Sequence, residues 1–265
     1  MADMKGPAAL KILNTAAFVF LVIINILANL LPINGVTTGE VSEAYPNLFT
    51  PASCTFSIWG GIYFLLALFV LYQFGVFNGS ENTRDDYIME IGYLFAATSL
   101  ANVAWLFAWH YRMIFLSVLL LLALLAGLAV IGSRLDKKEF SGKEWIFVKL
   151  PFSLYFGWVT VAAIANVIVW LVSIGFTGFS NQTWTAIAMV LALVAGVCGV
   201  VNRKNIGYGL AVLWAFAGIF MKHISPDGFN GQYHVVIVVA VFSMIVLVLS
   251  ILFLSAANRK HPIKL

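Results

Sequence analysis

Residues 150–174 read LPFSLYFGWVTVAAIANVIVWLVSI and contain no Asp, Glu, Lys, Arg or His. A helix needs about 20 mostly apolar residues to cross the ~30 Å hydrocarbon core of a bilayer. This stretch is long enough, and its apolar residues do not alternate with polar ones as they would in a barrel strand. It therefore predicts a transmembrane helix.

Seven further stretches are similarly long and apolar, and the composition of the whole chain is that of a membrane protein. Of the 265 residues, 62% are hydrophobic and 10% charged, with a mean hydropathy of +0.97, which is too apolar for a soluble domain. Because backbone polar groups in lipid must be satisfied within the segment, the spans are expected to be helices. The predicted fold class is all-α, a polytopic membrane bundle of about eight transmembrane helices. The segments are Leu10–Leu31, Phe56–Phe77, Tyr87–Trp109, Met113–Gly132, Trp145–Ile174, Trp184–Val201, Ile206–Met221 and Val235–Ala256.

The basic residues indicate an orientation. With the N-terminus in the cytoplasm, thirteen Lys and Arg residues fall on the inner side and two, Arg112 and Lys222, on the outer side. This bias follows the positive-inside rule, so we expect a multi-pass integral membrane protein with both termini cytoplasmic. No basic face interleaved with aromatic residues indicates nucleic-acid binding. The inner residues are Lys5, Lys11, Arg84, Arg134, Lys137, Lys138, Lys143, Lys149, Arg203, Lys204, Arg259, Lys260 and Lys264.

Asn and aromatic residues recur inside four of the predicted spans at helical spacing, and the topology places most of them in the outer half of the bundle. Taken singly, a Trp is typical of the interfacial belt and an intramembrane Asn of a bond between helices. Together they predict a cavity suited to a flat, apolar ligand with one or two polar groups. The residues are Asn25 and Asn29, Trp59 and Tyr63, Asn102 and Trp105, and Tyr155, Trp158, Ala162, Asn166 and Trp170.

At these residues the sequence resembles the TspO/MBR family, the translocator or tryptophan-rich sensory proteins. The family's second-helix pattern of Pro, Trp and Tyr is matched in TPASCTFSIWGGIY by Pro51, Trp59 and Tyr63. Its third-helix Asn and Trp are matched in SLANVAW, and its fifth-helix Tyr, Trp, Ala, Asn and Trp in LYFGWVTVAAIANVIVW. The resemblance covers about Leu10–Ser173 and leaves three further helices beyond it.

The resemblance implies a TspO/MBR-like five-helix bundle over residues 1–174, followed by three additional helices and a basic tail over 175–265. It also implies a pocket for a lipophilic small molecule, tetrapyrrole-like or sterol-like, with Trp59 and Asn102 as its hydrogen-bond donors. Membrane lipid is the other expected partner, and a homo-oligomer is left open. The implied ligand-binding residues are Trp59, Tyr63, Asn102, Trp105, Tyr155, Trp158, Ala162, Asn166, Trp170, Asn25 and Asn29.

The leading hypothesis is a receptor or carrier without catalytic residues, metal or cofactor. His110, His223 and His234 show no metal-ligand spacing, so no enzyme is indicated. The alternative is a secondary transporter or permease for a small hydrophobic solute, which eight helices would suit. Ion-coupled carriers usually need intramembrane carboxylates, and Glu90 is the candidate for that role.

Overall fold

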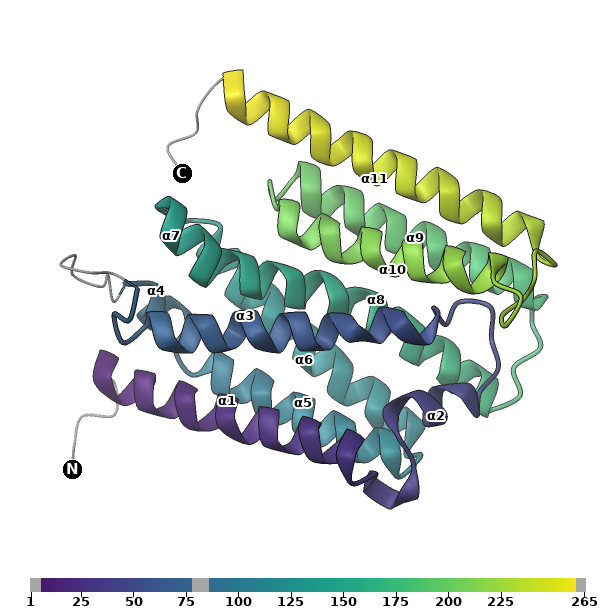
Figure 1. The fold of residues 1–265 in the computed structure, drawn as a ribbon, viewed down its shortest axis with the longest axis horizontal. Coiled ribbons are helices and arrows are strands. Elements are labelled where there is room, and N and C mark those ends of the chain that lie inside the picture. Colours follow the sequence, from purple (N-terminus) through teal and green to yellow (C-terminus); the bar gives the residue numbers. More distant parts are fainter. Residues whose placement is uncertain (1–5, 78–85, 261–265) are drawn as a thin grey trace. The chain divides into compact units, whose positions relative to one another are not determined.

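The computed structural model describes residues 6–77 and 86–260, apart from the side chains of residues 29 and 258–260. Every regular element in these ranges is helical, which confirms the predicted all-α membrane bundle. The elements, drawn in Figure 1, are α1 (Pro7–Leu30), η1 (Ile33–Gly35), α2 (Thr38–Glu43), η2 (Ser53–Ser57), α3 (Ile58–Tyr72), α4 (Asp86–Ile91), α5 (Leu94–His110), α6 (Ile114–Leu135), α7 (Gly142–Glu144), η3 (Trp145–Lys149), α8 (Leu150–Ser173), α9 (Asn181–Val201), α10 (Ile206–Ile224) and α11 (His234–Lys260).

Each of the eight predicted segments coincides with one of the long helices α1, α3, α5, α6, α8, α9, α10 and α11. Within the described residues, seven helical segments are long and apolar enough to cross a membrane. The third predicted segment is divided by a bend at Gly92, whose φ of +52° is one that glycine adopts without strain. The bend separates the short α4 from α5, which has 17 residues.

Polar residues mark the starts of three helices. Ser180 accepts a hydrogen bond from the backbone N–H of Thr183 at the start of α9, and Asn205 accepts one from Tyr208 at the start of α10. Ser141 and Glu144 form a reciprocal capping box ahead of the helical run that continues into α8. Such caps satisfy N–H groups that lack a partner within the helix, so these boundaries follow from local sequence.

The described chain divides into two compact units. The first unit contains the residues up to 38 and residues 60–152, and the second contains residues 39–59 and those from 153 onward. In the first unit, α5 packs against both α1 and α6 (Figure 1). Its core includes Phe69, Phe95 and Phe152, whose rings meet edge to face with centroids 5.1–5.6 Å apart.

In the second unit, α9, α10 and α11 pack side by side (Figure 1), and glycines allow their close approach. A Cβ atom added to Gly199 of α9 would overlap the ring of Tyr208. One added to Gly209 of α10 would overlap Val200, and one added to Gly157 of α8 would overlap the backbone of Tyr208. Small residues let membrane helices gain dispersion contacts that larger side chains would prevent. Gly157, Gly199 and Gly209 are therefore packing positions.

Candidate ligand-binding site

Three of the predicted site residues meet in the first unit. The Tyr63 hydroxyl donates to Asn25 Oδ1 over 2.9 Å, and Asn25 Nδ2 donates to Asn102 Oδ1 over 3.2 Å. Asn25 Nδ2 also lies 2.9 Å from the carbonyl oxygen of Leu21, and Asn102 is fully buried. We name Asn25, Tyr63 and Asn102 the amide cluster. It joins α1, α3 and α5 through side-chain hydrogen bonds, the ordinary structural use of Asn inside a membrane protein.

The two tryptophans of α5 hold a neighbouring segment in place. Trp105 and Trp109 are buried and stack with ring centroids 6.0 Å apart. The indole N–H of Trp109 donates to the carbonyl oxygen of Thr38 over 3.1 Å, and Asn34 Nδ2 donates to the carbonyl oxygen of His110. These bonds fasten the connection that follows α1 to the end of α5.

Four aromatic rings gather in the second unit, and we name them the aromatic cluster: Phe56 of η2, Trp59 of α3, and Tyr155 and Trp158 of α8. Trp59 meets Tyr155 and Trp158 with ring centroids 6.0 and 6.1 Å apart, and Phe56 meets Trp158 at 6.2 Å. All three contacts are edge to face, a favourable arrangement for aromatic quadrupoles. Phe56 was not among the predicted site residues, because it belongs to no motif that distinguishes it from neighbouring apolar residues.

Trp158 carries a buried donor without a partner. Its side chain is 3% exposed, and its Nε1 has no hydrogen-bond acceptor among the described residues. Burying an unpaired N–H typically costs about 1–3 kcal/mol, so a polar ligand atom that reached it would recover that cost. This unpaired indole N–H is the feature of the cluster that most directly suggests a ligand.

The predicted site residues are divided between the two units. Asn25, Tyr63, Asn102 and Trp105 belong to the first unit, as does Asn29, whose side chain lies outside the described part of the chain. The others, Trp59, Tyr155, Trp158, Ala162, Asn166 and Trp170, belong to the second, where Asn166 is buried and Ala162 half-buried. The expectation of one pocket lined by all of them stays a prediction.

Residues 48–55 lie along α10, a contact that the sequence analysis missed. His223 Nε2 donates to the carbonyl oxygen of Leu48 over 2.8 Å, and Ala52 N donates to that of Gly218 over 3.0 Å. Trp214 Nε1 donates to the carbonyl oxygen of Thr55 over 2.9 Å. The segment thus runs antiparallel to α10 and leads directly into Phe56 and Trp59. No local pattern links residues so far apart in the chain.

An open groove of about 560 Å³ also lies in the second unit, within the range of small-molecule pockets. Its walls come from the end of η2, from the start of α3, from α8 and from α10. The lining residues are Ser57, Ile58, Leu154, Leu210, Leu213, Trp214 and Ala217. No sequence motif had indicated a role for Trp214.

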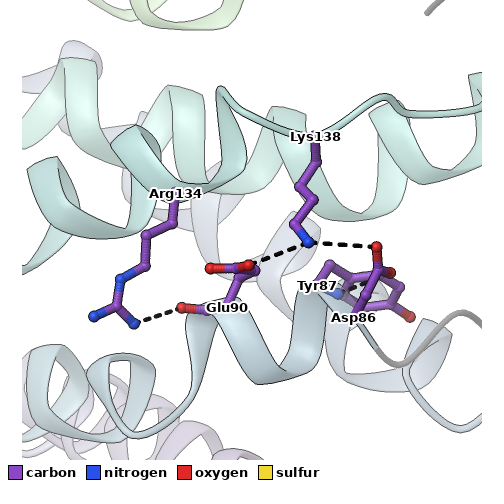
Figure 2. A network of polar contacts seen from close by, with 5 residues as sticks. All are labelled: Asp86, Tyr87, Glu90, Arg134 and Lys138. Carbon is purple, nitrogen blue, oxygen red and sulfur yellow. Dashed lines mark hydrogen bonds and ion pairs between the residues drawn. The ribbon is translucent and has the colours of Figure 1, made fainter.

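The carboxylate of Glu90 belongs to a charged network in the first unit (Figure 2). Lys138 Nζ lies 3.1 Å from Glu90 and 3.6 Å from Asp86, and Arg134 donates to the Glu90 carbonyl oxygen over 2.9 Å. The Glu90 side chain is 37% exposed. The network ties α4 to the end of α6 and the residues that follow it, so Glu90 pairs with a basic side chain near a helix end.

We expect Lys138→Gln to lower the thermal unfolding midpoint slightly at neutral pH. The hydrogen bond to Glu90 raises the pKa of Lys138 above its usual value of 10.5. A raised pKa means that the charged form stabilises the fold below about 10.5 and that this contribution disappears as the pH rises through the folded-state pKa. Thermal unfolding of both proteins across the alkaline range measures this. A constant difference between them at every pH would contradict the assignment.

The described residues hold no group of three or more His, Cys, Asp or Glu side chains placed to bind a metal ion. Fold and composition define the class: an integral membrane protein built from apolar helices.

A family model described as TSPO-like protein matches residues 11–253. The chain belongs to this family, as the motifs predicted. The match continues beyond the first five predicted helices, through α9 and α10 and into α11. The division of the chain into residues 1–174 and 175–265 stays a prediction. Among curated proteins and among solved structures, no significant match is found.

Proposed function

We propose that this protein is a non-enzymatic membrane receptor or carrier for a lipophilic, tetrapyrrole-like ligand, which the aromatic cluster binds. The observation that supports this most is the buried, unpaired indole N–H of Trp158 beside the rings of Trp59 and Phe56. The rings offer a large apolar contact area, and the N–H offers one directional bond to a polar atom of the ligand. Membership of the TSPO-like family agrees with this function.

We assign the amide cluster a structural role within this proposal. Asn25 donates to Asn102 and to a backbone carbonyl and accepts from Tyr63, so its hydrogen-bonding groups are engaged inside the protein. Bonds of this kind between membrane helices contribute about 1 kcal/mol each. Mutation of this cluster should therefore reduce stability before it reduces affinity.

The transporter alternative receives less support. Ion-coupled carriers generally place an acidic side chain within the membrane, where its protonation or cation binding drives the cycle. Glu90, the candidate from the sequence, instead pairs with Lys138 at an exposed position. We also retain the cytoplasmic placement of both termini as part of the proposal, on the basis of the positive-inside bias.

The test compares the same substitution at two buried tryptophans. Trp158→Phe keeps an aromatic ring but removes the unpaired N–H, and we expect protoporphyrin IX to bind about five-fold more weakly, the effect of one hydrogen bond. Trp109→Phe removes an N–H that is paired with Thr38, so we expect unchanged affinity. Binding is measured by porphyrin fluorescence with the protein in lipid nanodiscs.

Stability provides the control for this pair. Both variants lose similar ring area, but only Trp109→Phe loses a hydrogen bond that the free protein makes. We therefore expect Trp109→Phe to be the more destabilised by about 1 kcal/mol in thermal unfolding. Equal porphyrin affinities of wild type and Trp158→Phe would refute the aromatic cluster as the site.

A further inference from the structure

The groove in the second unit opens at the middle of an apolar helix. Leu210, Leu213, Trp214 and Ala217 occupy the central part of α10 (Ile206–Ile224), which is apolar enough to cross a membrane. Leu210 and Trp214 are each 43% exposed, so this face of α10 is accessible from the surroundings. In a bilayer the surroundings at this depth are hydrocarbon chains, and a ligand can enter sideways from the lipid.

The lining favours an aliphatic ligand without charge. Five of the seven side chains, Ile58, Leu154, Leu210, Leu213 and Ala217, are aliphatic, and none is charged. The indole of Trp214 forms a wall of defined orientation, because its N–H is bonded to the carbonyl oxygen of Thr55. A phosphate head group would find no cation here, whereas an aliphatic chain would find close dispersion contacts.

Ser57 provides the one side-chain hydroxyl of the groove, and among the described residues it lacks the backbone hydrogen bond that many, though not all, hydroxyls on the helices make. Eight of those donate to a backbone carbonyl three or four residues earlier: Thr15, Thr98, Ser99, Ser117, Ser133, Thr160, Ser173 and Ser250. Within the described part of the chain the Ser57 hydroxyl has no such bond and is exposed. A hydroxyl facing hydrocarbon without a partner is unfavourable, so a polar atom of a ligand would stabilise it.

We propose that this groove binds a long-chain aliphatic alcohol from the membrane. The chain lies against Leu154, Leu213 and Trp214, and its hydroxyl group exchanges a hydrogen bond with Ser57. A bilayer phospholipid fits less well, since its polar groups stay at the interface and its acyl chains have no atom that could pair with Ser57. The site is separate from the aromatic cluster in its residues and in the ligand it takes.

The experiment uses two photoreactive probes with the protein in nanodiscs: a diazirine-bearing hexadecanol and the matching diazirine-bearing hexadecane. Mass spectrometry maps the labelled residues after irradiation. We expect the alcohol to label the groove residues of α8 and α10. Ser57→Ala should reduce this labelling about five-fold for the alcohol and leave it unchanged for the hydrocarbon, because one hydrogen bond is lost. Ser53→Ala, an exposed serine of η2 outside the groove lining, is the matched control.

A second variant tests the volume of the groove. Leu213→Trp fills it, and we expect labelling by both probes at α10 to fall at least about five-fold. Leu191→Trp makes the same change on α9, where Leu191 is 58% exposed and outside the groove, and should leave labelling unaltered. Equal labelling of wild type and Ser57→Ala by the alcohol, or undiminished labelling of Leu213→Trp, would overturn the proposal. Unchanged porphyrin affinity of Ser57→Ala would show that the two sites are distinct.

Discussion

Gly157→Val is expected to destabilise the protein by about 3 kcal/mol, at the upper end of the range for overpacking a core. A Cβ atom at this position of α8 would overlap the backbone carbonyl oxygen of Tyr208 and lie 3.0 Å from Ala211 Cβ. The obstacle is main chain of α10, which cannot move aside by a change of rotamer. The two helices must therefore move apart to make room for the valine side chain, and they lose dispersion contacts when they do.

Thermal unfolding in detergent micelles measures this effect, and Gly61→Val is the matched control. Gly61 also lies in a helix, α3, and a Cβ atom added there would have no neighbour within 4 Å. The control variant should unfold close to the wild-type temperature. If the Gly157 and Gly61 variants unfolded at the same temperature, the close approach of α8 and α10 would be wrong.

Gly218→Ala is expected to cost about 2 kcal/mol and to weaken porphyrin binding as well. A methyl group at Gly218 would overlap the side chain of Thr55 and push away the segment that runs along α10. This segment is held by Trp214 and Gly218 through backbone carbonyl groups, and it continues directly into Phe56 and Trp59 of the aromatic cluster. Displacing it therefore moves two of the four rings.

Because the obstacle here is a side chain, a second substitution should relieve it. We expect Thr55→Gly to restore part of the stability lost in Gly218→Ala, so that the double variant is more stable than the sum of the two single changes predicts. A double-mutant cycle on thermal unfolding, with porphyrin affinity as a second readout, measures the coupling. Strict additivity of the two changes would show that Thr55 and Gly218 do not touch.

The positions of the helices could be predicted from the sequence, because a long apolar stretch in a bilayer almost always forms a transmembrane helix. Eight transmembrane segments were predicted; a long helix lies in each of them among the described residues, and seven helical segments there are long and apolar enough to cross a membrane. The bend at Gly92 was missed, since a glycine within an apolar run can equally continue a helix. The placement of both termini in the cytoplasm, which charge bias predicts, stays a prediction.

The candidate site was predictable only in part. Helical spacing predicted that Trp59 and Tyr63 share one face of a helix, and the family motifs added Tyr155 and Trp158 of another helix to the same predicted pocket. Spacing could not reveal that Tyr63 bonds Asn25 whereas Trp59 packs on Trp158. Two residues four apart on one helix thus have different kinds of partner, amide in one case and aromatic in the other.

By itself the sequence determined that this chain is a helical membrane protein and a member of the TSPO-like family, because hydropathy and motif order are properties of the linear chain. Only the tertiary structure decided which donors are satisfied. The indole N–H groups of Trp109 and Trp214 are bonded to carbonyl oxygens, whereas that of Trp158 is buried and has no acceptor in the part of the chain that the structure describes. The physical reason is that a hydrogen bond depends on the distance and direction between two atoms, and residues remote in sequence acquire these only when the helices pack.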